Sequence, residues 1–305
     1  RVGLFELEEK KYIFILHMHH IITDALSNRI FWDEFNRLNH GRSLPVLKIQ
    51  YKDFSQWQNL ETVKASRQKQ ETYWLKEFQG EIPVLHLPID YPRPLNKNYT
   101  GSYHAFKISP GETAALKALA YKQNTTLFVV VLSIYLVFLS KISRQKDIIV
   151  GIPIAGRRWA GLEQTLGMFI NTLAPRNYPG EDMRFEDFIN GVRERSLKAF
   201  ENHDYPFEDL VDRVVKQREP GRNPLFDAFF TFRIPGVIQD MPEGITGDEE
   251  TASKVPGTDA APGTTKAGES QNRDRSLLCM FDIYLMGAEI KEEILLALVY
   301  STELF

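Results

Sequence analysis

Three histidines and an aspartate fall within eight residues, "HMHHIITD" at 17–24, directly after the apolar run "KYIFIL". A strand that ends in histidines presents imidazole groups from a rigid element at the mouth of a cleft. Imidazole has an unperturbed pKa of about 6.5, so it can accept or donate a proton near neutral pH. The pattern therefore predicts a histidine that acts as a base or holds a reacting group. It also raises the question of what Asp24 does four residues after His20.

Two other interpretations of the histidine cluster are open. A metal ion could be held by "HMHH" together with Asp24, but a metal site also needs suitable ligands from elsewhere in the chain. No second carboxylate cluster accompanies these residues, and the remaining histidines stand alone: His40, His86, His104 and His203. We therefore expect no metal. The cluster could also consist of helix-start and core histidines without any chemical role.

Composition narrows the class of protein. With 305 residues, of which 43% are hydrophobic, the chain can bury a large core. The net charge of −3 implies no surface for nucleic acid. Cys279 is the only cysteine, which excludes an internal disulfide and fits a cytoplasmic protein. No segment has the roughly 20 apolar residues of a membrane span, and there is no signal peptide. Because residue 1 is Arg and the last residues stop in mid-pattern, we expect an excerpt of a longer chain.

The elements that must position the cluster follow from periodicity. Alternation and β-prone residues predict strands at 1–8, 11–18, 101–108, 147–156, 225–232, 277–287 and 293–301, the last two as an antiparallel hairpin. Helical spacing predicts helices at 25–39, 51–60, 66–80, from 109 onwards, 125–142, and 184–215 with a break at Pro206. Asp24 and Ser27 stand where the cap of the first helix is needed.

This alternation indicates an α/β sandwich layered on a mixed sheet. The Pro-rich stretch 83–94 is the best candidate for a boundary, so we expect one lobe at 1–95 and a second at 96–305. Residues 235–275 are rich in Gly, Thr, Ser, Pro and acidic residues, which predicts a flexible insert.

Five stretches, in order along the chain, resemble motifs of the condensation domains of non-ribosomal peptide synthetases, which are related to chloramphenicol acetyltransferase-like acyltransferases. "HHIITDA" (19–25) resembles HHxxxDG, and "YKDFSQWQ" (51–58) is similar to YxDFAxWQ. The other three resemble GxFVNTxxxR, the NQDYPFE-type motif and RDxSRNPL, and they are "LGMFINTLAPR" (166–176), "NHDYPFEDL" (202–210) and "REPGRNPLFD" (218–227).

The resemblance implies two chloramphenicol acetyltransferase-like lobes. The family's first two motifs are absent, so we expect the N-terminal lobe to be incomplete in this excerpt. It also implies a modular synthetase of secondary metabolites such as antibiotics, and a tunnel between the lobes. Upstream and downstream peptidyl carrier proteins insert phosphopantetheine arms there, next to an adenylation domain. The downstream aminoacyl amine attacks the upstream acyl or peptidyl thioester. His20 is at the family's catalytic position, His19 supports it, and the domain itself binds no cofactor.

Asp24 has two possible roles. It could orient a histidine as a dyad partner, or it could cap the following helix and pair with an arginine. The resemblance favours the second role, with Arg157 of "IPIAGRRW" as the partner and Arg158 as the fallback. We expect Asn171 and Asn223 to shape lobe contacts and the tunnel.

Ala25 departs from the family pattern, which has Gly. Ala is the best helix former and follows a good cap residue, so we predict a negative φ and an active site here. Two alternative functions remain open. An epimerisation domain would need a second acid or base opposite His20, and none is marked. A degenerate, non-catalytic member that recruits carrier or other partner proteins has Ala25 as its only support. "MHHIITDALS" also resembles the class that takes an L-configured donor.

Overall fold

The computed structural model describes residues 1–233 and 277–305, so the expected insert at 235–275 lies outside the described residues. The described chain divides into two compact units. Residues 1–51 together with 160–169 form what we call the smaller unit, and the rest forms the larger unit. The lobe boundary expected near residue 95 stays a prediction.

The smaller unit begins with a hairpin that leads into a helix. Strands β1 (Val2–Glu8) and β2 (Lys11–Leu16) pair antiparallel, and Lys10 turns the chain between them with a φ of 63°. A single 3-10 turn, η1 (His20–Ile22), separates β2 from helix α1 (Ala25–Asn39). Phe14 of β2 packs against α1, because its ring centroid lies 5.7 Å from that of Trp32 and 5.1 Å from that of Phe35. These contacts fix the strand that precedes the histidines against the helix that follows them.

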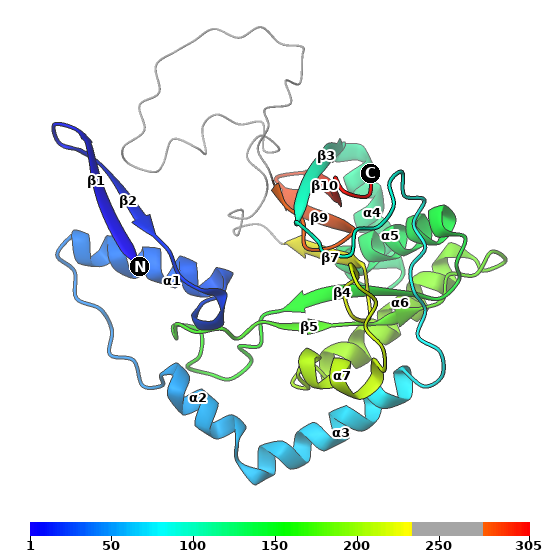
Figure 1. The fold of residues 1–305 in the computed structure, drawn as a ribbon, viewed down its shortest axis with the longest axis horizontal. Helices are drawn as coiled ribbons and strands as arrows, with labels where there is room; N and C mark the ends of the chain where they lie inside the picture. The colour runs from blue at the N-terminus through cyan, green and yellow to red at the C-terminus, as the bar shows by residue number, and fades with distance from the viewer. Residues whose placement is uncertain (234–276) are drawn as a thin grey trace, which may run out of the picture. The chain divides into compact units, whose positions relative to one another are not determined.

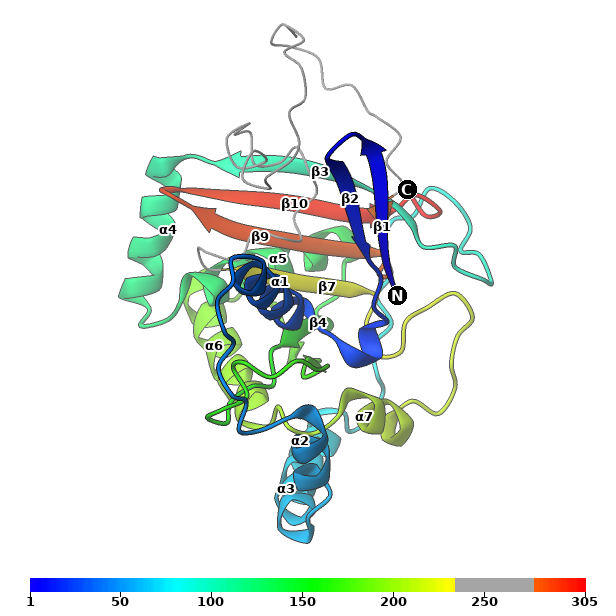
Figure 2. The same cartoon turned by 90° about the vertical axis from the view of Figure 1, so that its left-hand side faces the viewer.

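The larger unit is built on one mixed sheet in the order β5-β4-β7-β9-β10-β3-β8, with β6 also paired to β4 (Figure 2). Strand β7 runs parallel to β4 and β9, and the other pairs are antiparallel. The strands are β3 (Thr100–Ile108), β4 (Ile148–Ile154), β5 (Asn171–Leu173), β6 (Arg176–Asn177), β7 (Ala228–Arg233), β8 (Leu277–Leu278), β9 (Ile283–Ile290) and β10 (Glu293–Ser301).

Helices α4, α5 and α6 lie beside this sheet in Figure 1 and share its main core. Helix α5 is apolar on most of its circumference, and Val130, Leu132, Leu136 and Leu139 are completely buried, because it packs between the sheet and its neighbouring helices. The helices are α2 (Tyr51–Gln58), α3 (Glu61–Glu77), α4 (Pro110–Lys122), α5 (Leu127–Ser143), α6 (Phe185–Glu201) and α7 (Phe207–Val214).

Among the described residues, no single helix is both long and apolar enough to cross a membrane. In the described part of the chain, α4 and α5 taken together are long and apolar enough, but they are bent by 103° at the break between them.

The helices and most strands lie where periodicity predicted them, and the terminal hairpin β9–β10 is antiparallel as expected. Two differences have a physical reason. Strands β5 and β6 were not predicted, because runs of three and two residues are too short to show an alternation. The strand expected at 277–287 is interrupted at 279–282, where the carboxylate of Asp282 turns inward to Arg93.

Candidate active site

His20 lies in the turn after β2, and its neighbour His19 stabilises this turn. His19 is the cap of η1, and its Nδ1 accepts a hydrogen bond from the backbone N–H of Ile21 at 3.1 Å. The backbone carbonyls of His19 and His20 accept from Ile22 and Thr23 at 3.1 and 3.3 Å. An Nδ1 that accepts carries no proton, so neutral His19 has its proton on Nε2. The side chain of His20 is exposed.

Asp24 is buried directly behind this turn, with 5% of its surface exposed. Its Oδ1 accepts from the backbone N–H of Ser27 at 2.7 Å, which makes Asp24 the side-chain cap of α1. Its Oδ2 accepts from the backbone N–H of Phe169 at 3.1 Å. Both carboxylate oxygens are thus engaged with main-chain donors, one local and one 145 positions along the chain.

Tyr51 connects the second motif stretch to the same place. Its hydroxyl donates to the backbone carbonyl of Met168 at 2.9 Å, and its ring meets that of Phe169 edge-on at 5.0 Å. Burial, and then the negative charge of Asp24, raise the pKa of Tyr51. A Cβ at Gly167 would overlap the ring of Tyr51, so this close approach requires glycine. The motif stretches at 19–25, 51–58 and 166–176 therefore meet at Asp24, Tyr51 and 167–169.

Ala25 is the first residue of α1 and has a negative φ, as the sequence predicted. The left-handed conformation that would favour Gly does not occur here, and the Ala25 side chain is exposed. The alanine is therefore accommodated without backbone strain.

The two candidate arginines lie after β4 in the larger unit. Arg158 pairs with Asp204 at 3.2 Å and stacks on Trp159, with its guanidinium carbon 4.7 Å from the ring centroid. The pairing of Asp24 with Arg157 stays a prediction.

Asn171 uses its whole amide group to hold the loop before α7. Its Nδ2 donates to the carbonyls of His203 and Tyr205, both at 2.8 Å. Its Oδ1 accepts from the backbone N–H of Thr172 at 2.9 Å and of Phe207 at 3.2 Å. Two motif stretches, at 166–176 and 202–210, are therefore joined by this one side chain.

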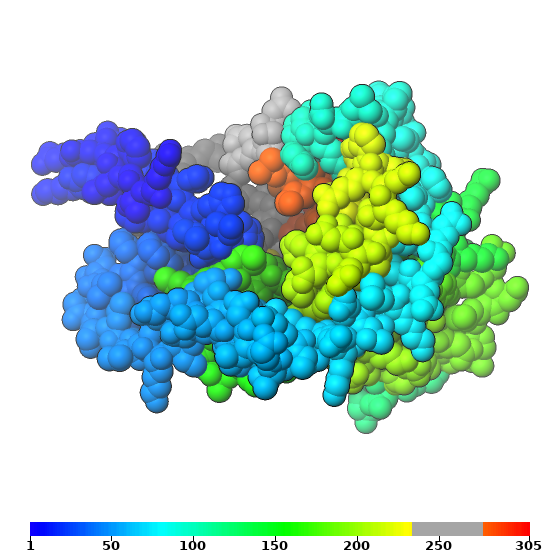
Figure 3. All heavy atoms as spheres, turned by 60° about the horizontal axis from the view of Figure 1, so that its bottom comes forward, coloured from blue at the N-terminus to red at the C-terminus, as the bar shows by residue number. Residues whose placement is uncertain are grey.

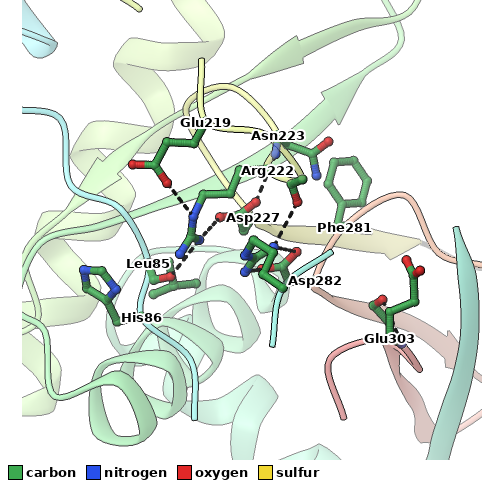
Figure 4. A network of polar contacts seen from close by, with 12 residues as sticks. Leu85, His86, Glu219, Arg222, Asn223, Asp227, Phe281, Asp282 and Glu303 are labelled. Atoms are coloured by element: carbon green, nitrogen blue, oxygen red, sulfur yellow. Dashed lines mark hydrogen bonds and ion pairs between the residues drawn. The ribbon is translucent and has the colours of Figure 1, made fainter. Parts of the chain in front are cut away.

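Asn223 lies in a buried ionic cluster (Figure 4). Asp227, 3% exposed, accepts from the backbone N–H of Asn223 at 3.1 Å and from Arg222 at 2.6 Å. Arg93 holds the second carboxylate, Asp282, which is 1% exposed. Burial, and then the neighbouring charge of Asp282, raise the pKa of Asp227. Two arginines, together with Lys97 at 3.5 Å from Asp282, compensate the two buried carboxylates, as burial of charge requires.

A cavity of about 310 Å³ adjoins this cluster. The cavity is lined by residues of three segments of the larger unit, 80–85, 147–149 and 214–227. Figure 3 shows the last segment in yellow, beside the cyan stretch that follows α3. Sequence reasoning did not find the two-arginine, two-carboxylate cluster, because Arg93 and Asp282 are 189 positions apart. In the part of the chain that the structure describes, no group of three or more His, Cys, Asp or Glu residues could hold a metal ion.

The larger unit has a mixed α/β fold, and His19 caps the histidine turn of the smaller unit. A family model described as Condensation domain matches residues 1–305. Tyrocidine synthase 3 of Brevibacillus parabrevis is 41% identical over 305 residues, which are 100% of this chain and 4% of that protein. The chain belongs to the condensation-domain family, and it spans a small fraction of the length of the curated synthetase it matches.

Solved structures agree on the fold. The complex of the X-domain and OxyB from teicoplanin biosynthesis contains a similar chain, with a TM-score of 0.80 at 20% identity over 100% of this chain and 65% of that one. The condensation domain of the monacolin K polyketide synthase MokA has a TM-score of 0.72 at 17% identity over 100% of this chain and 67% of that one. The predicted family and fold class are confirmed, while the incompleteness of the N-terminal lobe stays a prediction.

Proposed function

We propose that this chain forms an amide bond between an upstream acyl or peptidyl thioester and a downstream aminoacyl thioester. Both substrates are carried on phosphopantetheine arms of peptidyl carrier proteins, in a synthetase where an adenylation domain is adjacent. The observation that carries the proposal is the match of the condensation-domain model to all 305 residues. The 41% identity to tyrocidine synthase 3 supports a peptide synthetase as the context.

The chemical step needs little activation of its reactants. An α-amino group has a pKa of about 7.7–8.0, so an appreciable fraction is neutral at pH 7. Its nitrogen attacks the thioester carbonyl, the C–N bond forms, the C–S bond breaks, and the thiol leaves with a proton. His20 holds the amine and takes its proton as the tetrahedral intermediate forms. Holding both arms in place supplies much of the rate, because it makes the encounter effectively unimolecular.

The other site residues act by holding structure. His19 stabilises the turn through its bond to Ile21, and Asp24 caps α1. We propose an ion pair between Asp24 and Arg157. The engagement of both Asp24 oxygens with main-chain donors supports this structural role over a dyad with histidine. The strain-free backbone at Ala25 supports an active site, because that residue was the only ground for a non-catalytic member.

Single-turnover transfer between two loaded carriers, in the complete synthetase, tests the proposal. His20→Ala should lower the transfer rate constant at least about 100-fold with no change in folding, because it removes the acid–base group. His17→Ala is the matched control from the same exposed turn, and it should transfer at the wild-type rate. An unchanged rate in His20→Ala would refute the role of His20. A wild-type protein that inverts the loaded α-carbon without forming an amide would be an epimerisation domain.

A further inference from the structure

Ser27 makes an unusual pair of hydrogen bonds from the first turn of α1. The residue is completely buried. Its hydroxyl donates to the backbone carbonyl of Gly167 at 2.7 Å and accepts from the backbone N–H of the same glycine at 3.0 Å. The side chain thus satisfies both main-chain groups of Gly167, as the backbone of a neighbouring strand would.

Two more hydrogen bonds hold the next two residues. Oδ2 of Asp24 accepts from the N–H of Phe169, and the hydroxyl of Tyr51 donates to the carbonyl of Met168. We call the main chain of 167–169 the clasped segment. Each of its residues is bound by a side chain of the smaller unit, so main-chain groups of this segment have hydrogen-bond partners, as buried polar groups require.

The clasped segment is tied to the histidine turn through continuous structure. The N–H of Thr23 donates to the carbonyl of His20 at 3.3 Å, and the hydroxyl of Thr23 donates to Oδ1 of Asn28, in the first turn of α1, at 3.0 Å. The histidine turn and the first turn of α1 therefore form one hydrogen-bonded unit. Ser27 is the member of this unit that reaches outward to Gly167.

We infer that Ser27 is a positioning residue for amide formation, which fixes the clasped segment against the turn that carries His20. The inference rests on the proposed function. Ser27 itself touches no reacting atom in this scheme. Its effect arises because displacement of a catalytic group by about 1 Å can cost on the order of 100-fold in rate.

The test is Ser27→Ala in the complete synthetase, assayed by single-turnover transfer between loaded carriers. The transfer rate constant should fall about 10- to 100-fold, while half-saturation by the carriers changes less than about twofold. Ser27→Thr keeps the hydroxyl and should recover most of the rate. Exchange of the Gly167 amide proton should become faster in Ser27→Ala, because that proton loses its acceptor.

Ser133→Ala is the matched control. Ser133 is also completely buried, and its hydroxyl donates to the carbonyl of Val129 at 2.7 Å, inside α5 of the larger unit. It removes one buried serine hydroxyl far along the chain from the clasped segment and should leave the transfer rate within about twofold of wild type. An equal loss of rate in both variants would overturn the inference, because the effect would then be one of general stability.

A wild-type rate in Ser27→Ala would also overturn it, even where His20→Ala is inactive and the proposed function stands. If Ser27→Ala does not fold, Ser27→Cys decides, because its thiol has a similar shape but bonds weakly. The Cys variant should be slowed, and a full rate would refute the role. A wild-type protein without transfer would instead count against the proposed function.

Discussion

At the scale of single residues, the site depends on side chains that bind the main chain. His19, Asp24 and Ser27 each accept a backbone N–H, and the last two reach residues more than 100 positions away. Residue types and spacing alone indicated that Asp24 could cap a helix, because it precedes a helical pattern. They could not indicate Phe169 or Gly167 as partners, because every residue type offers a main-chain carbonyl and nearly every type a main-chain N–H.

Ala25 gives a prediction at this scale. It is the first residue of α1, has a negative φ and carries an exposed methyl group. Ala25→Gly should therefore lower the free energy of unfolding by up to about 1 kcal/mol, because glycine loses more backbone freedom on folding. Denaturant unfolding measures this change. Ala115→Gly, at an exposed position of α4, is the control and should cost a similar amount. A more stable Ala25→Gly would mean that alanine is strained at this position.

At the scale of elements, the helices and long strands were readable from periodicity. "YKDFSQWQ" coincides with α2, as helical spacing predicted, and its Phe54 is buried. The short strands β5 and β6 could not be predicted, because pairing with β4 defines them rather than any pattern of their own.

Asn171 of β5 gives the prediction at this scale. Its amide makes four hydrogen bonds, three of them to the loop at 203–207 that leads into α7. Asn171→Ala should lower the free energy of unfolding by about 2–4 kcal/mol, because each lost bond is worth roughly 1 kcal/mol and leaves a main-chain group unsatisfied. Thermal or denaturant unfolding measures this loss.

Asn190 provides the comparison for that variant. Its Nδ2 makes one longer bond, of 3.3 Å, to Gln123. Asn190→Ala should cost less than about 1 kcal/mol. Equal effects of the two variants would show that Asn171 does not hold the loop.

At the scale of the larger unit, distant segments are joined by buried charge. Arg93 pairs with Asp282, just before β9, and donates to the carbonyl of Gly221 in the loop after α7 at 3.1 Å. Arg222 of that loop pairs with Asp227 and donates to the carbonyl of Leu85, in the stretch after α3, at 3.2 Å. Cys279 lies three residues before Asp282 and is 4% exposed, with its thiol donating to the carbonyl of Phe281 at 2.9 Å. The reactivity of this thiol therefore reports whether the joined region is closed.

Burial raises the pKa of Cys279 to about 11. The thiolate is the reactive form, and an unfolded cysteine has a pKa of about 8.5, so the folded chain should be alkylated by iodoacetamide on the order of 100-fold more slowly at pH 8. Because the pKa is higher in the folded state, the protonated thiol adds to the free energy of unfolding. This contribution is complete below about pH 8.5 and is lost as the pH rises towards 11. The free energy of unfolding should fall across this window in the wild type, relative to Cys279→Ala. If the native chain were labelled as fast as the chain unfolded in guanidinium, the region around Asp282 would be open in solution.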